Sequence, residues 1–427
     1  MNINILVTGD IHIGKRSSAI PDGQAQAATK HTWRALVDYA LANPIDIVVL
    51  TGDIIDRDNR FFEAANPLQS GLRELNNNGI EVYIVSGNHD FDVLPQVVDR
   101  EPLPHVHLLG RNGRWEDALF TKGENRIQFI GWSFPKQHFM EDPTQSLNPL
   151  VIEKDIPTIA LVHGDAYNLS RTSYAPMNKE RLNSFTGIDA WLLGHIHRPD
   201  IVSDKNPLIL YPGSPHALSP KERDEHGPYI LTVNNRDIQS RQLPFSPVRY
   251  EYLPIDISEV VDRESVKSII VEQLNAHSST FTTNERMTHL VYDLSLQGKY
   301  ADTNSLHGLE EELADFEGMH SFYITIRKIG RNIQAPINIE ELAKDPSYIG
   351  VLANTVLLLR NGGSNAFIDQ LIDSWKHKYH TLSSSTAYQH LKKPIDDEKL
   401  NTQARQAILS ECNDLISQLV YSKDHEV

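Results

Sequence analysis

The stretch "EVYIVSGNHDFDV", residues 81–93, joins an apolar run to a group of polar side chains. The run stops at Gly87, which is expected to let the backbone turn, and Asn88, His89 and Asp90 follow in succession. A turn after a strand can hold such residues for its own hydrogen bonds, so the stretch alone does not distinguish a turn from a site. The neighbouring segments decide between them.

Four other apolar runs end in a similar way. They are "INILVTGD" (3–10), "IDIVVLTGD" (45–53), "TIALVHGD" (158–165) and "AWLLGHIH" (190–197). Each is a short segment rich in β-branched residues or leucine, followed by Gly and residues that can bind metals. Continuous apolar runs of this length are typical of strands buried on both faces, in sheets covered by helices.

The segments between the first three runs predict helices. Residues 29–44 carry apolar side chains at helical spacing and end at Pro44, and residues 61–79 repeat this pattern and end at Gly79. From residue 125 onward strand patterns dominate. We therefore predict an α/β fold for residues 1–245, a two-sheet sandwich flanked by helices.

Two further regions follow this domain. Residues 243–254, "LPFSPVRYEYLP", contain three prolines and are interpreted as a linker. Residues 246–330 predict a small α+β domain, with helices at 258–277 and 305–316 and strands at 288–298 and 321–329. Residues 331–427 predict helices, and a stripe runs along the last one: Leu400, Ala404, Ile408, Cys412, Leu415 and Leu419.

Composition restricts the class of protein. The chain has 427 residues, which favours two or three domains, and its longest apolar runs are too short to span a bilayer. A single cysteine, Cys412, and the lack of a secretory signal pattern favour the cytoplasm. The net charge of −16 argues against binding nucleic acid through a bulk positive field, so contacts with phosphates must be local.

The polar residues after the five runs predict a metal centre, because ligands bind at the carboxyl ends of strands in open α/β sheets. Oxygen and nitrogen donors without cysteine favour Mn²⁺, with Mg²⁺, Fe²⁺ or Zn²⁺ as alternatives. The donors outnumber the ligands of one ion, which indicates two divalent metal ions sharing a carboxylate. The candidate donors are Asp10, His12, Asp53, Asp56, Asn88, His89, Asp90, His163, His195 and His197.

The motifs "DIHIG", "GDIID", "GNHD", "HGD" and "GHIH", in this order, resemble those of the calcineurin-like metallophosphoesterases. The resemblance implies a first ion held by Asp10, His12 and His197 and a second held by Asn88, His163 and His195, with Asp53 bridging. It also implies a metal-bound hydroxide as nucleophile. His89 would then protonate the leaving oxygen or stabilise the transition state, and Asp90 would orient the His89 ring.

The segment "YPGSP" after the last histidine pair resembles that of the SbcD-type double-strand-break nucleases, with the shorter YhaO-like branch nearest. This resemblance implies DNA as substrate and a capping role for residues 246–330. It also implies that the helical region docks on an SMC-like coiled-coil ATPase, and a homodimer is also compatible. Asp56 stands where some of these nucleases have histidine, which affects how the substrate phosphate is oriented.

Several residues are candidates for contact with DNA phosphates, and ordinary loop solubility is the alternative explanation for them. They are Lys15, Arg16, Arg57 and Arg60 near the first two motifs, and His216 and Arg223 after "YPGSP". His105 and His107 alternate in "PHVHLLG" and could chelate a metal, but a structural role is the better interpretation because they lie outside the five motifs.

The sequence therefore predicts a dinuclear DNA phosphodiesterase, with 3′–5′ exonuclease and also endonuclease activity, as the nuclease subunit of an SMC-like ATPase complex in DNA end processing. One alternative is a phosphatase or cyclic-nucleotide phosphodiesterase acting on a small substrate. The other is a weakly catalytic scaffold that binds DNA ends, against which the intact ligand set argues.

Overall fold

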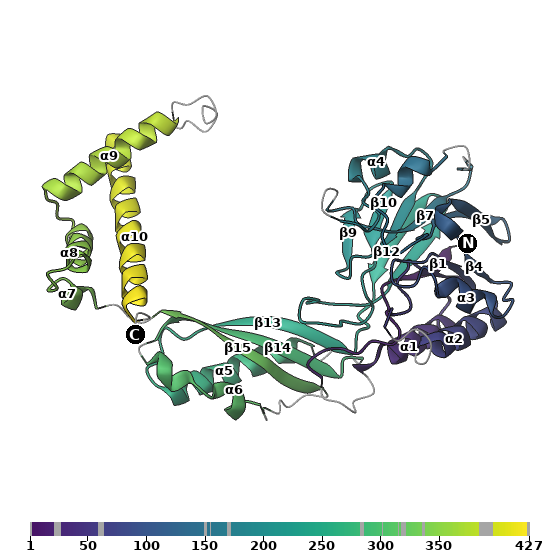
Figure 1. Cartoon of the computed structure of the whole chain (residues 1–427), viewed down its shortest axis with the longest axis horizontal. Coiled ribbons are helices and arrows are strands. Elements are labelled where there is room, and N and C mark those ends of the chain that lie inside the picture. The colour runs from purple at the N-terminus through teal and green to yellow at the C-terminus, as the bar shows by residue number, and fades with distance from the viewer. Residues whose placement is uncertain are drawn as a thin grey trace. The chain divides into compact units, whose positions relative to one another are not determined.

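The computed structural model describes residues 2–20, 27–58, 64–148, 152–153, 155–168, 172–281, 286–300, 302–314, 316, 322–334, 338–383 and 396–424 (Figure 1). The chain divides into two compact units. The first comprises Met1–Ile255, Glu264–Leu296 and His307–Arg331, and the second comprises Asp256–Arg263, Gln297–Leu306 and Asn332–Val427.

The first sheet of the first unit has the strand order β12-β11-β1-β2-β3-β4. Its strands are β1 (Ile3–Thr8), β2 (Ile47–Leu50), β3 (Glu81–Ile84), β4 (Val106–Leu108), β11 (Tyr229–Asn234) and β12 (Asp237–Gln242). Strands β1 to β4 are parallel, whereas β11 and β12 are antiparallel to their neighbours. Helices α1 (Thr29–Ala42), α2 (Ala65–Asn77) and α3 (Leu94–Asp99) connect the parallel strands, so the predicted β-α-β-α-β start is confirmed.

The second sheet has the order β5-β6-β7-β8-β10-β9. Its strands are β5 (Glu116–Lys122), β6 (Asn125–Trp132), β7 (Thr158–His163), β8 (Ala190–Gly194), β9 (Asp200–Ser203) and β10 (Leu208–Tyr211). The edge strands β5 and β9 have no counterpart in the sequence prediction. They are largely exposed, and their apolar residues form runs of only two or three, shorter than the continuous runs of the central strands.

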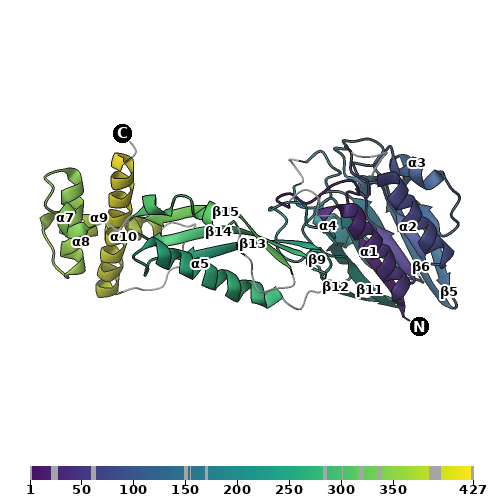
Figure 2. The ribbon, with the colours of Figure 1, turned by 90° about the horizontal axis from the view of Figure 1, so that it is seen from below.

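The two sheets pack face to face, and helices cover their outer faces. Between the sheets, Ile5 and Val49 of the first sheet share a buried cluster with Phe129 and Leu161 of the second. On the outer face of the first sheet, alternate residues of the same strands pack against α1 and α2 (Figure 2). Short helices also belong to this part of the unit: α4 (Lys179–Ser184), η3 (Arg111–Gly113) and η4 (Pro143–Ser146). The predicted two-sheet sandwich flanked by helices is confirmed.

The predicted linker at residues 243–254 is wrong, because most of it forms strand β13 (Val248–Asp256). This strand belongs to a sheet of order β13-β14-β15, with β14 (His289–Lys299) and β15 (Tyr323–Gln334). Pro254 is exposed on β13, which is an edge strand of this sheet, and edge strands tolerate proline. Prolines are typical of linkers, but here they lie on an edge strand and directly before it.

Helices accompany the three-stranded sheet, and the predicted helix at 258–277 begins later than expected, at Arg263. The helical elements here are α5 (Arg263–Ser278), η6 (Ser279–Phe281), η7 (Thr303–Leu306) and α6 (Leu309–Glu312). The single long helix predicted at 305–316 is instead the two short pieces η7 and α6. The α+β character of this region is as predicted.

The C-terminal region is helical, as predicted. It contains α7 (Ile339–Leu342), α8 (Tyr348–Arg360), α9 (Ala366–Ser383) and α10 (Asp397–Asp424). The predicted stripe on α10 is buried from Leu400 to Cys412, but Ile416 takes the next core position, while Leu415 and Leu419 are 38% and 40% exposed. Across the described residues, none of the helices combines the length and the apolar character that crossing a membrane requires.

Candidate metal centre

Polar side chains gather where the central strands of both sheets end. Asp10, Asp53 and Asn88 follow β1, β2 and β3, while His163 ends β7 and His195 follows β8. Contacts between these side chains link the two sheets. Side-chain contacts bring together Asp10, His12, Asp53, Asn88, His163 and His197. His195 joins them through its backbone N–H, which donates to Asp10, and through its ring, which lies beside the ring of His163.

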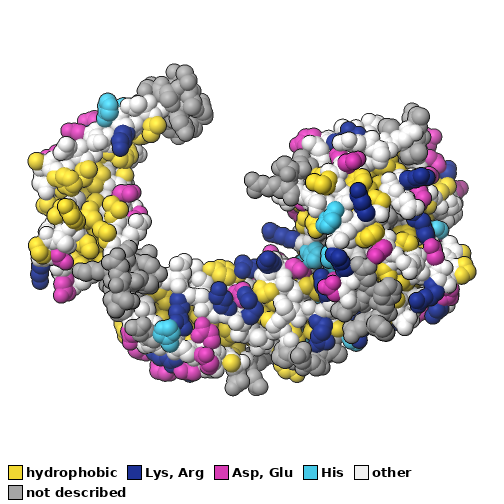
Figure 3. Space-filling model, in the orientation of Figure 1, with side chains coloured by type: hydrophobic (Ala, Val, Ile, Leu, Met, Phe, Trp, Pro, Cys, Tyr) yellow, Lys and Arg dark blue, Asp and Glu magenta, His cyan; other side chains and the backbone are white. Residues whose placement is uncertain are grey.

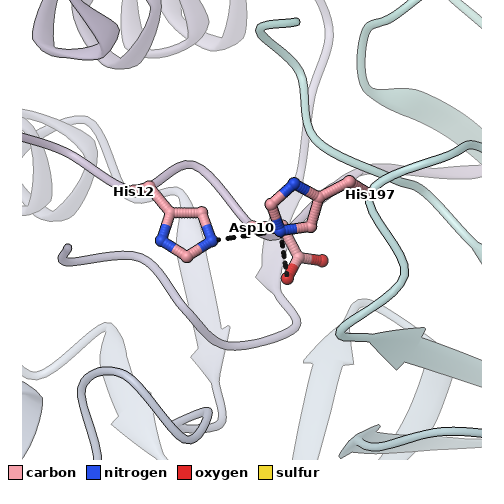
Figure 4. Close-up of side chains that lie close together, drawn as sticks. All are labelled: Asp10, His12 and His197. Carbon is pink, nitrogen blue, oxygen red and sulfur yellow. Dashed lines mark hydrogen bonds and ion pairs between the residues drawn. The ribbon is translucent and has the colours of Figure 1, made fainter. Parts of the chain in front are cut away.

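Asp10, His12 and His197 form one group whose ligand atoms lie within 4.8 Å of one another (Figure 4). The Nε2 atoms of His12 and His197 are 3.2 Å apart, and His197 Nε2 lies 3.9 Å from Asp10 Oδ1. Asp10 and His12 are buried and His197 is half-buried. Two imidazole nitrogens and a carboxylate oxygen that face one another are a suitable donor set for a divalent cation.

A second group surrounds His163. Its Nδ1–H donates to the carbonyl of Thr51, which leaves Nε2 facing Asn88 Oδ1 at 3.2 Å and Asp53 Oδ2 at 3.4 Å. Asp10, Asp53 and His163 also have ligand atoms within 4.8 Å of one another. The ring of His195 lies 5.4 Å from the ring of His163. Two acceptor oxygens pointing at one imidazole nitrogen favour a cation at their meeting point.

Asp53 lies between the two groups. Its Oδ2 is 4.0 Å from His12 Nε2 on one side and 3.4 Å from His163 Nε2 on the other. Its Oδ1 accepts the backbone N–H of His89 at 2.8 Å, which fixes the carboxylate. This is the position that a carboxylate shared by two ions would occupy.

Burial and neighbouring charges shift the pKa values of these groups in opposite directions. Burial raises the pKa of Asp10 to about 6 and lowers the pKa of His12 to about 4. Burial alone would lower the pKa of His163, but Asp53 beside it raises that pKa to about 9. Burial alone would raise the pKa of Asp53, but His163 outweighs it and holds that pKa far below its usual range.

The backbone at the strand ends is strained where it presents these side chains. Asp10, His12, Asp53 and His195 have φ values of +48°, +48°, +49° and +94°. Non-glycine residues rarely adopt this region, and such strain is concentrated at functional sites. The sequence predicts that Gly87 lets the backbone turn, but the structure gives a different reason for glycine. A Cβ at this position would lie 2.1 Å from Asp53 Oδ1. Glycine therefore allows close packing against the shared carboxylate.

A comparison with protein families assigns this part of the chain. The calcineurin-like phosphoesterase family matches residues 3–199, which include all seven donors. This region is a calcineurin-like phosphoesterase domain. The family assignment made from the five motifs is therefore confirmed.

Proteins similar to the phosphoesterase domain include an uncharacterized metallophosphoesterase and a DNA repair protein. An uncharacterized metallophosphoesterase, YhaO of Bacillus subtilis, is 28% identical over 228 residues, which are 53% of this chain and 55% of that protein. A DNA double-strand break repair protein, Mre11 of Methanopyrus kandleri, is 26% identical over 243 residues, covering 51% of this chain and 50% of that protein. The chain thus spans about half the length of these curated relatives.

Solved structures also resemble the phosphoesterase domain at low identity. The protein TT1561 of Thermus thermophilus aligns with 57% of this chain and 99% of its own, at 14% identity and a TM-score of 0.37. Similarity at this level carries no information on function.

The donor set fits the pair of divalent metal ions that this family uses. Carboxylate, imidazole and amide donors suit such ions. His163 and His197 each direct Nδ1 at an acceptor oxygen, of Thr51 and Glu222, so that Nε2 faces the other donors. This is the orientation that metal-binding histidines require.

Sequence reasoning missed Glu222, which holds His197. Its Oε1 accepts the Nδ1–H of His197 at 3.0 Å, and its Oε2 accepts the Leu218 N–H at 2.8 Å and the Ser214 hydroxyl at 3.1 Å. The segment "KERDE" contains three acidic residues, and nothing local distinguishes Glu222 from the other two. Only the tertiary contact identifies it.

The predicted contact between Asp90 and the His89 ring is wrong. Asp90 Oδ1 accepts the N–H of Gly87 at 2.8 Å, and Oδ2 accepts those of Ile54 at 2.7 Å and Ile55 at 3.3 Å. Burial raises the pKa of Asp90 to about 7. Because the Asp90 carboxylate accepts backbone N–H groups from both segments, it holds the loops after β2 and β3 together. These N–H groups lie beyond the strand ends and need an acceptor.

The carboxylate beside His89 is instead Asp56. Asp56 Oδ1 lies 3.9 Å from His89 Nδ1, 3.5 Å from His12 Nδ1 and 3.0 Å from Lys15 Nζ. It is buried, and Lys15 is engaged in this ion pair. Both were predicted as substrate contacts, and the structure places them within the histidine cluster.

The remaining substrate candidates differ in exposure. Arg16 and Arg57 are exposed near the first two motifs, and Arg60 lies outside the described residues. Arg223 is exposed, with its guanidinium 5.0 Å from the ring centre of Tyr252. These arginines remain compatible with contact to phosphates.

The prediction that His216 contacts substrate is wrong, because its side chain is fully buried. Its Nε2 lies 2.7 Å from the Ser17 hydroxyl, which donates to the Ala217 carbonyl, and its Nδ1 lies 2.6 Å from the Thr32 hydroxyl. Both nitrogens are therefore engaged. The residue joins the segments around residues 17, 32 and 217 inside the domain.

Proposed function

We propose that this protein is a dinuclear metal-dependent phosphodiesterase that cleaves DNA, as a 3′–5′ exonuclease and endonuclease. The observation that carries the proposal is the convergence of seven oxygen and nitrogen donors at the strand ends of both sheets. Such a set exceeds what one ion requires and suits two ions that clamp a phosphate.

In this proposal the donors divide as the motifs imply. Asp10, His12 and His197 hold one ion, and Asn88, His163 and His195 hold the other, with Mn²⁺ the favoured metal. Asp53 bridges them, in keeping with its place between His12 and His163. When bound, such ions polarise the phosphoryl oxygens and lower the pKa of coordinated water.

His89 supplies proton transfer to the leaving oxygen. Its side chain is 32% exposed, and its Nε2 lies 4.0 Å from Asp53 Oδ2, beside the donors. A histidine at this distance reaches the substrate without displacing a donor. Asp90 acts indirectly, by fixing the loop that carries His89.

DNA as substrate is supported by relatives named as DNA double-strand break repair proteins. Residues 1–245 are the nuclease domain, and residues 246–330 are a capping domain that guides the strand. Because the chain carries a net charge of −16, affinity for DNA must come from a few exposed cations such as Arg16, Arg57 and Arg223.

The helical region, residues 331–427, is proposed to bind an SMC-like ATPase subunit. Large apolar side chains of α8 and α9 are exposed, with Tyr348 at 88%, Val351 at 53% and Phe367 at 49% (Figure 3). Contiguous apolar exposure of this kind is typical of partner surfaces. Removal of residues 331–427 should abolish co-purification of the ATPase, and full retention would place the interface elsewhere.

Digestion of end-labelled DNA tests the nuclease. The purified protein with Mn²⁺ should shorten duplex and single-stranded DNA from the 3′ end, and the metal-depleted protein should not. Cleavage of bis(p-nitrophenyl) phosphate or cyclic nucleotides without cleavage of DNA would indicate a phosphodiesterase for small substrates. Binding of DNA ends without hydrolysis of any ester would indicate a scaffold.

A further inference from the structure

A cavity of about 580 Å³ lies beside the loop of residues 220–224, which contains Glu222. It is lined by Arg198, Lys221 and Arg223 from the phosphoesterase domain and by Tyr252 from β13. Arg198 directly follows His197, and Lys221 and Arg223 flank Glu222, which binds His197. Residues that line the cavity are therefore sequence neighbours of His197 and of the carboxylate that binds it.

The charges around this cavity leave two cations available. The acidic residues Asp224 and Glu251 also line it, but Asp224 pairs with Arg198 at 3.8 Å and Glu251 pairs with Arg249 at 2.5 Å. Lys221 has no ion pair within the described part of the chain, and Arg223 contacts the ring of Tyr252. In a chain of net charge −16, this is a local positive site.

Tyr252 gives the cavity an aromatic wall. Its side chain is 41% exposed, and the Arg223 guanidinium lies 5.0 Å from its ring centre. Arg223 also forms a β-bridge with Tyr250, which fixes the loop to β13. Cations beside an exposed ring provide the two elements that hold a nucleotide of a single strand, one for the phosphate and one for the base.

Lysine and arginine side chains gather beside the histidines on the face of the phosphoesterase domain shown in Figure 3. We propose that this cavity binds one nucleotide of a single DNA strand next to the scissile phosphate. Lys221 and Arg223 bind its phosphate, and the base stacks on Tyr252. This inference rests on the proposed nuclease function and assigns a specific strand-binding site to it.

Binding of a fluorescein-labelled oligothymidylate tests the proposal. The full chain is titrated in a chelating buffer, so that affinity is measured without cleavage. Tyr252→Ala should weaken binding by about 5- to 150-fold, the range for loss of one base stack, and Tyr252→Phe should retain wild-type affinity. For an oligomer that is abasic throughout, the Tyr252→Ala change should have no effect.

The contribution of Lys221 and Arg223 is measured separately, through the salt dependence of binding. The double variant Lys221→Ala/Arg223→Ala should reduce the slope of log affinity against log salt by about 0.7 for each phosphate that is no longer bound. Lys205→Ala, an exposed lysine between β9 and β10, is the matched control and should keep the slope. Thermal unfolding verifies that each variant is folded.

Several outcomes would overturn the proposal. One is wild-type affinity for both Tyr252→Ala and the double variant, and another is an equal loss for normal and abasic strands in Tyr252→Ala. A wild-type protein that hydrolyses bis(p-nitrophenyl) phosphate but binds no oligonucleotide would also exclude this cavity as a strand site, while leaving the metal chemistry intact. If the wild type binds the strand through Tyr252 yet cleaves nothing, the cavity stands and the nuclease proposal fails.

Discussion

Two clusters of histidine and carboxylate lie at opposite ends of β3. At its carboxyl end is the metal centre, and at its start Glu81 accepts from His105 Nδ1–H and His107 Nε2–H, each at 2.7 Å, in what we call the Glu81 cluster. The residue types are the same. In the described part of the chain, however, the groups of three donors within 4.8 Å of one another all lie at the metal centre.

The difference lies in convergence and burial. In the Glu81 cluster each oxygen of one carboxylate already binds one imidazole, and the three side chains are 22% to 39% exposed. At the metal centre the side chains of Asp10, Asp53 and His163 are almost completely buried and face one another. A buried set of donors needs a cation to balance it, whereas the Glu81 cluster is already satisfied by its own hydrogen bonds.

The largest effect is expected from Asp53→Asn. Loss of the carboxylate between His12 and His163 should reduce hydrolysis of bis(p-nitrophenyl) phosphate by more than the ~10- to 100-fold typical of an outer-shell change. It should also reduce the bound Mn²⁺ measured by mass spectrometry of the purified protein. Full metal content in this variant would show that Asp53 does not bridge.

His89→Ala should separate catalysis from metal binding. Activity should fall by about 10²- to 10⁴-fold, the range for loss of general acid catalysis, because His89 lies beside the donors without joining them. Metal content should equal that of the wild type. A variant that loses metal together with activity would make His89 a ligand.

Glu222→Gln should have an intermediate effect. A neutral amide holds the His197 Nδ1–H less firmly and cannot accept the Leu218 N–H through its NH₂ group, so metal affinity should fall by ~10- to 100-fold. Isothermal titration with Mn²⁺ measures this change. Glu225→Gln, on the same loop, is the control and should leave affinity unchanged.

The smallest effect is expected from Glu81→Gln. Exposed ion pairs contribute about 0–1 kcal/mol, so thermal unfolding should change little, and Mn²⁺ content and hydrolysis should match the wild type. If the wild type binds Zn²⁺ or Ni²⁺ at the Glu81 cluster and this variant loses that ion, the contrast between the Glu81 cluster and the metal centre would be wrong. It would show that exposed histidines at this end of β3 also bind metal.

Most of the fold followed from local patterns. Central strands were recognised because burial on both faces requires continuous apolar runs, and α1 and α2 because their apolar residues repeat at helical spacing. The edge strands β5 and β9 have only short apolar runs, and β13 contains Pro254, so their patterns are typical of loops and of a linker. Edge strands owe their pairing to neighbours far away in the sequence.

The candidate site followed the same division. The sequence by itself determined which residues could be donors, because the chemistry of Asp10, His163 and the other motif residues depends on residue type and on their place after strands. Only the tertiary structure decided what surrounds them. Glu222, which lies outside the five motifs, accepts from His197. The Asp90 carboxylate accepts from backbone N–H groups and does not contact the His89 ring. A hydrogen bond needs two groups within about 3 Å, and chain folding alone sets which distant residues meet.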